Sequence, residues 1–166
     1  MKRMIALVMI ALIPICSCDE RTEKTVSGDI DSTSIAPLTV QLPGILIAPT
    51  GDTVQAPPGT DVILYYWLPL EKYDDMQDDL RFLTTLDTRY LVLPLQPDHG
   101  SRNHAQRIVN NMEISLPVFL ADSAVMEVID TSILPSCLIM TSDGEVFEEC
   151  GFGAPARLLA QIQSGE

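Results

Sequence analysis

The stretch YYWLPLEKYDD, residues 65–75, joins an apolar segment to an acidic one and predicts a strand that leads directly into a helix. Residues 61–67 (DVILYYW) form a continuous apolar run rich in β-formers, which indicates a strand buried on both faces. From Leu70 to Leu86, apolar residues recur every three or four positions, as on one face of a helix. The opposite face is predicted to carry four carboxylates: Asp74, Asp75, Asp78 and Asp79. Such early carboxylates suit the positive end of a helix dipole.

The segments on either side continue this alternation. Residues 37–56 mix short apolar runs with Pro and Gly and predict an irregular hairpin that turns at TGD (50–52). After the first helix we expect strand 89–96, helix 100–112 with Ser101 as a possible cap, short strand 116–122, helix 123–130, strands 136–140 and 145–150, and a helix from Pro155. Strands and helices alternate in the first part of the domain, and the last two strands form a hairpin. This order predicts an α/β fold, with a mixed central sheet and helices on both faces.

The N-terminus has the pattern of a bacterial lipoprotein signal. Lys2 and Arg3 precede an apolar run that is too short for a comfortable transmembrane helix, and the run ends in ICSC (15–18). We interpret residues 1–17 as a signal peptide and Cys18 as the acylated first residue of the mature chain. A plain signal peptide with two incidental cysteines is the alternative. Asp19 resembles the inner-membrane retention signal of enteric bacteria. We therefore expect a lipid-anchored protein in the cell envelope of a bacterium, facing the periplasm from the inner membrane.

The charge and composition of the chain limit the classes of molecule that we expect it to bind. Residues 18–36 are polar and poor in aromatic side chains, and predict a flexible tether before a domain at 37–166. The net charge is −13, and cleavage would remove two of the ten basic residues. Nucleic acid is therefore excluded as an expected partner, because phosphate binding needs clustered Lys and Arg. The expected partners are the lipid bilayer, through acylated Cys18, and an unidentified protein or peptide of basic character.

Two sequence features of the domain resemble those of a known family. A strand that ends in Tyr66-Trp67 runs into a helix, and Pro135 precedes a strand and a hairpin that turns at Asp143-Gly144. Over roughly residues 37–166 the chain resembles membrane-anchored, extracytoplasmic thioredoxin-like (redoxin) proteins. The resemblance implies a thioredoxin-like fold with an N-terminal hairpin extension. It also implies a cis peptide bond at Pro135, where backbone groups bind extended peptides.

The residues that define the activity of that family are missing. Four positions after Trp67, where the first cysteine of a Cys-x-x-Cys motif would stand, the chain has Glu71, and Asp74 replaces the second cysteine. Two carboxylates at a helix start could share a metal ion or a proton, but the helix dipole lowers their pKa and a hard cation needs more ligands. We favour a solvated acidic turn. His99 and His104 are five residues apart and do not share a helix face, so we expect no metal site and no cofactor.

Cys137 and Cys150 are the two cysteines within the domain. If Asp143-Gly144 is a two-residue turn, Cys137 and Cys150 face each other in a non-hydrogen-bonded pair, within reach of a cross-strand disulfide. The alternatives are a redox-active pair, a structural staple and two buried free thiols. Two functions remain open at this point. One is a non-catalytic module that binds protein or peptide through Trp67, Glu71, Asp74, Leu134 and Pro135. The other is a thiol–disulfide oxidoreductase that uses Cys137 and Cys150.

Overall fold

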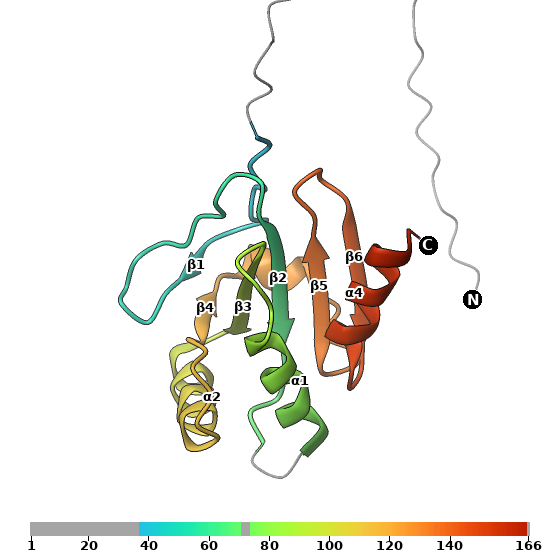
Figure 1. Ribbon diagram of the computed structural model, residues 1–166. Helices are drawn as coiled ribbons and strands as arrows, with labels where there is room; N and C mark the ends of the chain where they lie inside the picture. Colours follow the sequence, from blue (N-terminus) through green and yellow to red (C-terminus); the bar gives the residue numbers. More distant parts are fainter. Residues whose placement is uncertain (1–36, 71–73, 166) are drawn as a thin grey trace, which may run out of the picture. The chain divides into compact units, whose positions relative to one another are not determined.

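The computed structural model describes residues 37–70 and 74–165, whose elements follow the predicted order (Figure 1). The elements are β1 (Leu46–Ile47), β2 (Asp61–Tyr66), α1 (Asp74–Thr84), β3 (Tyr90–Gln96), α2 (His99–Asn111), β4 (Phe119–Ala121), α3 (Ser123–Val128), β5 (Ser136–Met140), β6 (Val146–Cys150) and α4 (Ala154–Ser164). The proposed signal peptide and tether lie outside the described residues. Within the described part, no helix is long and apolar enough to cross a membrane.

The strands form one mixed sheet in the order β1-β4-β3-β2-β5-β6. The central strand β2 pairs parallel to β3 and antiparallel to β5, and β3 pairs parallel to β4. The hairpin of β5 and β6 completes one side of the sheet, with β6 at its edge. Both connections β2–α1–β3 and β3–α2–β4 run away from β5, so α1 and α2 lie on the same face. The predicted mixed sheet is confirmed.

Two hydrophobic cores, one on each face, hold the layers together. On the first face, α1, α2 and α4 contribute Leu80, Val109 and Leu158 to a cluster around Tyr65 and Trp67. On the second face, the short helix α3 and residues of the 37–56 segment cover the opposite side chains of β2, β3 and β5. Because both faces are covered, residues 62–65 of β2 are fully buried, which explains their unbroken apolar run.

The N-terminal hairpin forms as predicted and joins the far edge of the sheet. It turns at residues 49–51, one residue before the predicted turn, where Ala48 N donates to Asp52 O, and β1 pairs antiparallel to β4. Asp122 fastens it to the sheet, because its carboxylate accepts a hydrogen bond from Ile45 N at 2.9 Å and also caps α3 through Val125 N at 3.0 Å. Gly44 passes so close to this cap that any Cβ would collide with Asp122.

Two local predictions were wrong. Helix α2 is capped by Asp98, whose carboxylate accepts from Ser101 N at 2.9 Å, and Ser101 lies inside the helix. Asp79 is not on the solvated face of α1, because only 5% of its surface is exposed. Its buried partners, described below, explain why a carboxylate is tolerated there.

Gln96 fixes the end of β2 from the neighbouring strand. Its side chain is 1% exposed, and its Nε2 donates to the carbonyl oxygen of Trp67 at 2.7 Å. Trp67 lies just past the last residue of β2, where ladder hydrogen bonds end. The amide of Gln96 therefore replaces a backbone partner at the point where the chain leaves the sheet.

Replacing Gln96 with Ala should lower the free energy of unfolding by about 1–3 kcal/mol, because the Trp67 carbonyl loses its buried donor. The measurement is urea unfolding followed by the fluorescence of Trp67, the only tryptophan in the chain. Gln55→Ala, at an exposed position, is the control and should change stability little. Equal effects of the two substitutions would show that the Gln96 hydrogen bond is not important for stability.

Candidate binding groove

An apolar groove lies where β2, α1, β5 and the turn between β6 and α4 meet. It has a volume of about 190 Å³ and is lined by Trp67, Leu68, Leu70, Met76, Leu134, Pro135 and Phe152, and we call it the Pro135 groove. Leu68, Leu70 and Phe152 are 51%, 44% and 40% exposed. Three large apolar side chains at the rim of one concave apolar site are typical of a surface that another molecule covers.

The floor of the groove combines the predicted proline with the tryptophan. The Leu134-Pro135 peptide bond is cis, as the resemblance implied, and Pro135 is buried at the start of β5. Trp67 is fully buried and stacks on Tyr65, with ring centroids 5.7 Å apart and planes at 24°. Among the described residues, none accepts a hydrogen bond from Trp67 Nε1. A buried donor without an acceptor costs about 1–3 kcal/mol, so a groove residue carries an unused hydrogen-bond donor.

Asp79 joins three of the elements that surround the groove. Its carboxylate accepts from the Tyr65 hydroxyl at 3.0 Å and from the Gly153 amide at 2.9 Å and 3.1 Å. Burial raises the pKa of Asp79, and the two hydrogen bonds offset part of that rise. Burial and the nearby Asp79 charge also raise the pKa of Tyr65, which therefore stays protonated and donates. One side chain thus links α1, β2 and the turn that carries Phe152.

Arg157 holds the same turn from the other side. Its guanidinium pairs with Glu149 of β6 and donates to the carbonyl oxygens of Phe152, at 2.6 Å, and Cys150, at 3.4 Å. The turn needs glycine at position 153, where φ is +77° and an added Cβ would lie 2.9 Å from the Arg157 guanidinium. Asp79 and Arg157 therefore both form hydrogen bonds with the turn that places Phe152 at the groove.

The predicted pairing of Cys137 with Cys150 was wrong, because the hairpin loop is one residue longer than expected. Residues 142–144 form the loop, Gly144 has a φ of +95°, and Thr141 N donates to Glu145 O. The register therefore pairs Cys137 with Glu149 and Ser136 with Cys150. A shift of one residue turns each side chain of a strand to the other face. Cys137 and Cys150 lie on opposite faces of the sheet as free thiols.

The two thiols differ in how deeply they are buried and in which groups surround them. Cys137 is fully buried in the first core, and burial, with the nearby Asp79 charge, raises its pKa, so it stays a neutral thiol. Cys150 is half-buried on the second face, with its Sγ 3.7 Å from Ser136 Oγ. Neither is among the residues that line the Pro135 groove. The groove therefore has no described thiol.

The remaining predicted site residues do not gather into a cluster. Asp74 begins α1 and is exposed, whereas Glu71 lies outside the described residues. His99 begins α2, and His104, further along it, has its Nδ1 3.2 Å from an Arg107 nitrogen. Over residues 37–70 and 74–165, no three His, Cys, Asp or Glu side chains come together in a way that could hold a metal ion.

Solved structures with the same architecture come from several bacteria. A putative thioredoxin from Neisseria meningitidis superposes with a TM-score of 0.57 at 19% identity, over 78% of this chain and 87% of that one. StoA from Bacillus subtilis gives 0.52 at 13% identity, over 72% and 97%. The exposed lipoprotein thioredoxin Etrx1 from Streptococcus pneumoniae gives 0.52 at 18% identity, over 72% and 97%.

The fold is thioredoxin-like. At these identities the likeness concerns the fold, and activity has to be argued from the residues of the groove. No protein-family model matches the sequence, and no curated protein matches it either.

Sequence reasoning missed several residues that build the groove. Leu68 and Phe152 carry no motif, and their role depends on which loops the sheet topology brings together. Asp79 had a weak signal. It lies three residues after Met76 and four before Leu83, which places it near the apolar face of the helix. Gln96 gave a similar signal, because it ends an otherwise apolar strand.

Replacing Asp79 with Asn should make the chain progressively more stable relative to wild type as pH rises from about 4 to about 7. A carboxyl whose pKa is higher in the folded than in the unfolded chain contributes its stability fully below the unfolded value, about 3.9, and loses it as pH rises through the folded value. Asn stays neutral and keeps an acceptor oxygen. The measurement is urea unfolding at both pH values, with exposed Asp78→Asn as the control. A pH-independent difference would contradict the raised pKa of Asp79.

Thiol labelling should separate the two cysteines. Cys137 should react with maleimide only after unfolding, because it is buried and protonated, whereas half-buried Cys150 should react in the folded chain. Mass spectrometry of the peptides that contain each residue gives both rates. The same digest, compared with and without reductant, should contain no Cys137–Cys150 cross-link. Finding that cross-link in the folded protein would contradict the observed register of β5 and β6.

Proposed function

We propose that this chain is a lipid-anchored, periplasm-facing binding module of thioredoxin-like fold, which holds an extended segment of another protein in the Pro135 groove without thiol chemistry. The single observation that carries this proposal is an open apolar groove lined by Trp67 and Pro135. The sequence resemblance aligns Glu71 and Asp74 with the two cysteines of the redox relatives, and this alignment supports a role without thiol chemistry.

The lining of the groove supports recognition of an apolar side chain in an extended chain. Leu68, Leu70 and Phe152 offer apolar contact area at the rim. Walls fixed by Asp79 and Arg157 lower the entropy cost of binding, because they are already ordered.

Charge favours a basic partner. The exposed first turn of α1 carries Asp74 and Asp75 beside the groove, and the whole chain has a net charge of −13. Steering by these charges would raise the association rate with a Lys- or Arg-rich segment, and added salt would screen it. The lipid anchor at Cys18 and the inner-membrane location belong to the same proposal and rest on the lipoprotein signal pattern and Asp19.

The test uses tryptophan-free peptides that contain one Leu or Phe among lysines, with Trp67 fluorescence and amide exchange as readouts. Leu68→Ser should weaken binding about tenfold, because it removes an apolar contact at the rim. Val128→Ser, at a 43% exposed apolar position on α3, should leave the affinity unchanged. No peptide binding, or equal losses in the two variants, would contradict the role of the groove.

Thiol chemistry is tested separately. The purified chain should not reduce insulin disulfides above the buffer rate, and Cys137→Ser together with Cys150→Ser should leave peptide binding unchanged. Reduction that disappears in this double variant would overturn the non-catalytic assignment.

A further inference from the structure

The edge of the sheet formed by β6 offers backbone groups that the fold does not use. Within the described residues, β6 pairs only with β5 and has no strand on its other side (Figure 1). In an antiparallel ladder, successive residues alternate between bonding to the partner and pointing away from it. Thr141 N donates to Glu145 O and Gly151 N to Pro135 O, so odd-numbered residues of β6 bond to β5. Val146 and Glu148 therefore direct their amide and carbonyl groups outward.

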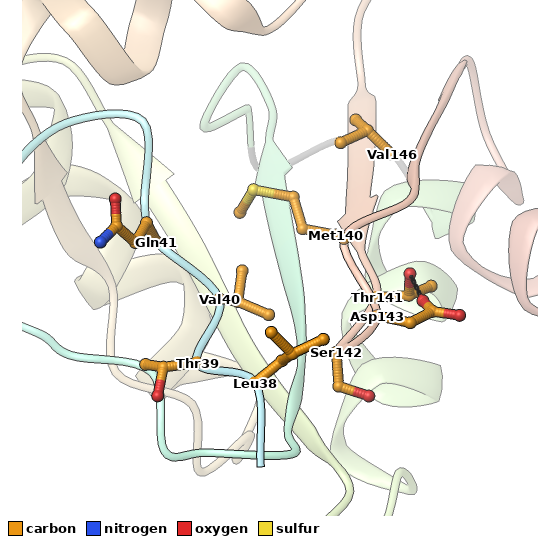
Figure 2. Close-up of a pocket in the computed structure, with 10 residues that line it drawn as sticks. Leu38, Thr39, Val40, Gln41, Met140, Thr141, Ser142, Asp143 and Val146 are labelled. Atoms are coloured by element: carbon orange, nitrogen blue, oxygen red, sulfur yellow. Dashed lines mark hydrogen bonds between the residues drawn. The ribbon is translucent and has the colours of Figure 1, made fainter. Parts of the chain in front are cut away.

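The side chains of this edge divide into an apolar and an acidic part. Val146 is 61% exposed, unusual for a strand residue of its type, and it forms one wall of a second depression of about 300 Å³, which has both apolar and polar lining residues. Figure 2 shows Val146 in this depression with Leu38, Val40 and Met140. Two residues along β6, on the same face, Glu148 is exposed. Its Oε1 accepts a hydrogen bond from Asp130 N at 2.6 Å, and its other carboxylate oxygen accepts none from the described residues. From Ser136 to Ala156 the chain has four carboxylates and no basic residue, and the next residue, Arg157, pairs with one of the four, Glu149.

The charges rule against a second copy of the chain as the occupant. Two β6 strands related by a two-fold axis would pair antiparallel. The residue numbers of any two opposite residues then add up to the same sum, which is twice the number of the residue at the axis. An axis at Phe147 places Glu145 opposite Glu149, and an axis at Glu148 or Glu149 places that residue opposite itself. Like charges directly opposite each other destabilise a strand pair. Each register that overlaps the strand well therefore puts two carboxylates together.

We propose that the free edge of β6 pairs with an extended, basic segment of another protein, which adds a strand to the sheet. The segment places an apolar side chain beside Val146 and a Lys or Arg beside Glu148. Main-chain hydrogen bonds to Val146 and Glu148 supply affinity, and the two side-chain positions supply selectivity. This surface is separate from the Pro135 groove, and the proposal does not depend on that groove binding anything.

The probe is the capped peptide Ser-Lys-Val-Leu-Val-Lys-Ser. Its Lys residues flank the Leu at two positions on either side, so one Lys reaches Glu148 whichever way the peptide runs. Two matched peptides carry N-methyl groups, one on the Leu and Lys amides and one on the two Val amides. The amides methylated in one peptide face one edge of the peptide strand, and those methylated in the other peptide face the opposite edge. The two peptides have the same side chains and the same charge. Strand addition requires that one methylated peptide lose binding and the other keep it.

Two variants of the chain locate the site. Val146→Pro removes an outward amide and leaves the β5 ladder intact, since proline is tolerated at the open edge of a strand. It should weaken binding at least about tenfold. Glu148→Lys should weaken binding of the Lys peptide and gain binding of the same peptide with Glu in place of Lys. Glu127→Lys, the same charge change at an exposed position of α3, should have little effect. Circular dichroism confirms that each variant is folded.

Amide exchange decides between the two surfaces. Peptide binding should slow exchange at the outward amides of Val146 and Glu148, and this protection should persist in Leu68→Ser, which weakens the Pro135 groove. Protection confined to positions 68 and 70, with none at Val146 and Glu148, would place the peptide in the Pro135 groove and overturn the proposal for β6. Equal binding by both methylated peptides, or a dimer of the free chain that Val146→Pro dissociates, would overturn it as well.

Discussion

The buried carboxylate of Asp79 is the interaction on which the groove and its surroundings depend. An apolar helix face would pack on β2 without it, but the carboxylate also accepts hydrogen bonds from Tyr65 on the strand and from Gly153 in the distant turn. The cost is a desolvated acid in the core, seen in its raised pKa. The gain is that three elements from different parts of the sequence are held in one arrangement. Tyr65, which stacks on Trp67, and Gly153, which follows Phe152, are the two residues that Asp79 joins.

Predicting the strands and helices from the sequence worked wherever one residue pattern dominated. The run at 61–67 and the spacing from Leu70 to Leu86 determine β2 and α1 because burial on two faces and on one face leave different periodicities. The junction at Trp67 and the proline at position 135 were likewise found as fixed local features. The groove itself could not be derived in this way. Its rim joins Leu68 to Phe152, which are 84 positions apart, and only the sheet order brings them together.

The prediction that failed most clearly did so through a single residue. The pattern Asp143-Gly144 is typical of both a two-residue turn and a three-residue loop, and the two differ by one step in register. In this protein Thr141 closes the loop with its hydroxyl as well as its backbone, accepting from Glu145 N at 3.0 Å. That side-chain bond favours the longer loop. Sequence spacing alone gives no energy difference between the two loops, so pairing across the hairpin could not be settled from numbering.

The longer loop separates the two thiols by the thickness of the sheet, and this separation determines how the domain responds to an oxidant. An oxidant that reaches the folded domain finds Cys150 half-exposed and Cys137 out of reach. Oxidation of the described domain therefore has no internal partner to close on, and a disulfide from Cys150 must join it to a different thiol-bearing partner. Oxidation of Cys150 would therefore give covalent adducts with other thiol compounds. The yield of these adducts would rise with the concentration of those compounds. A domain with both cysteines on one face would instead close a ring within itself, at a rate independent of its surroundings.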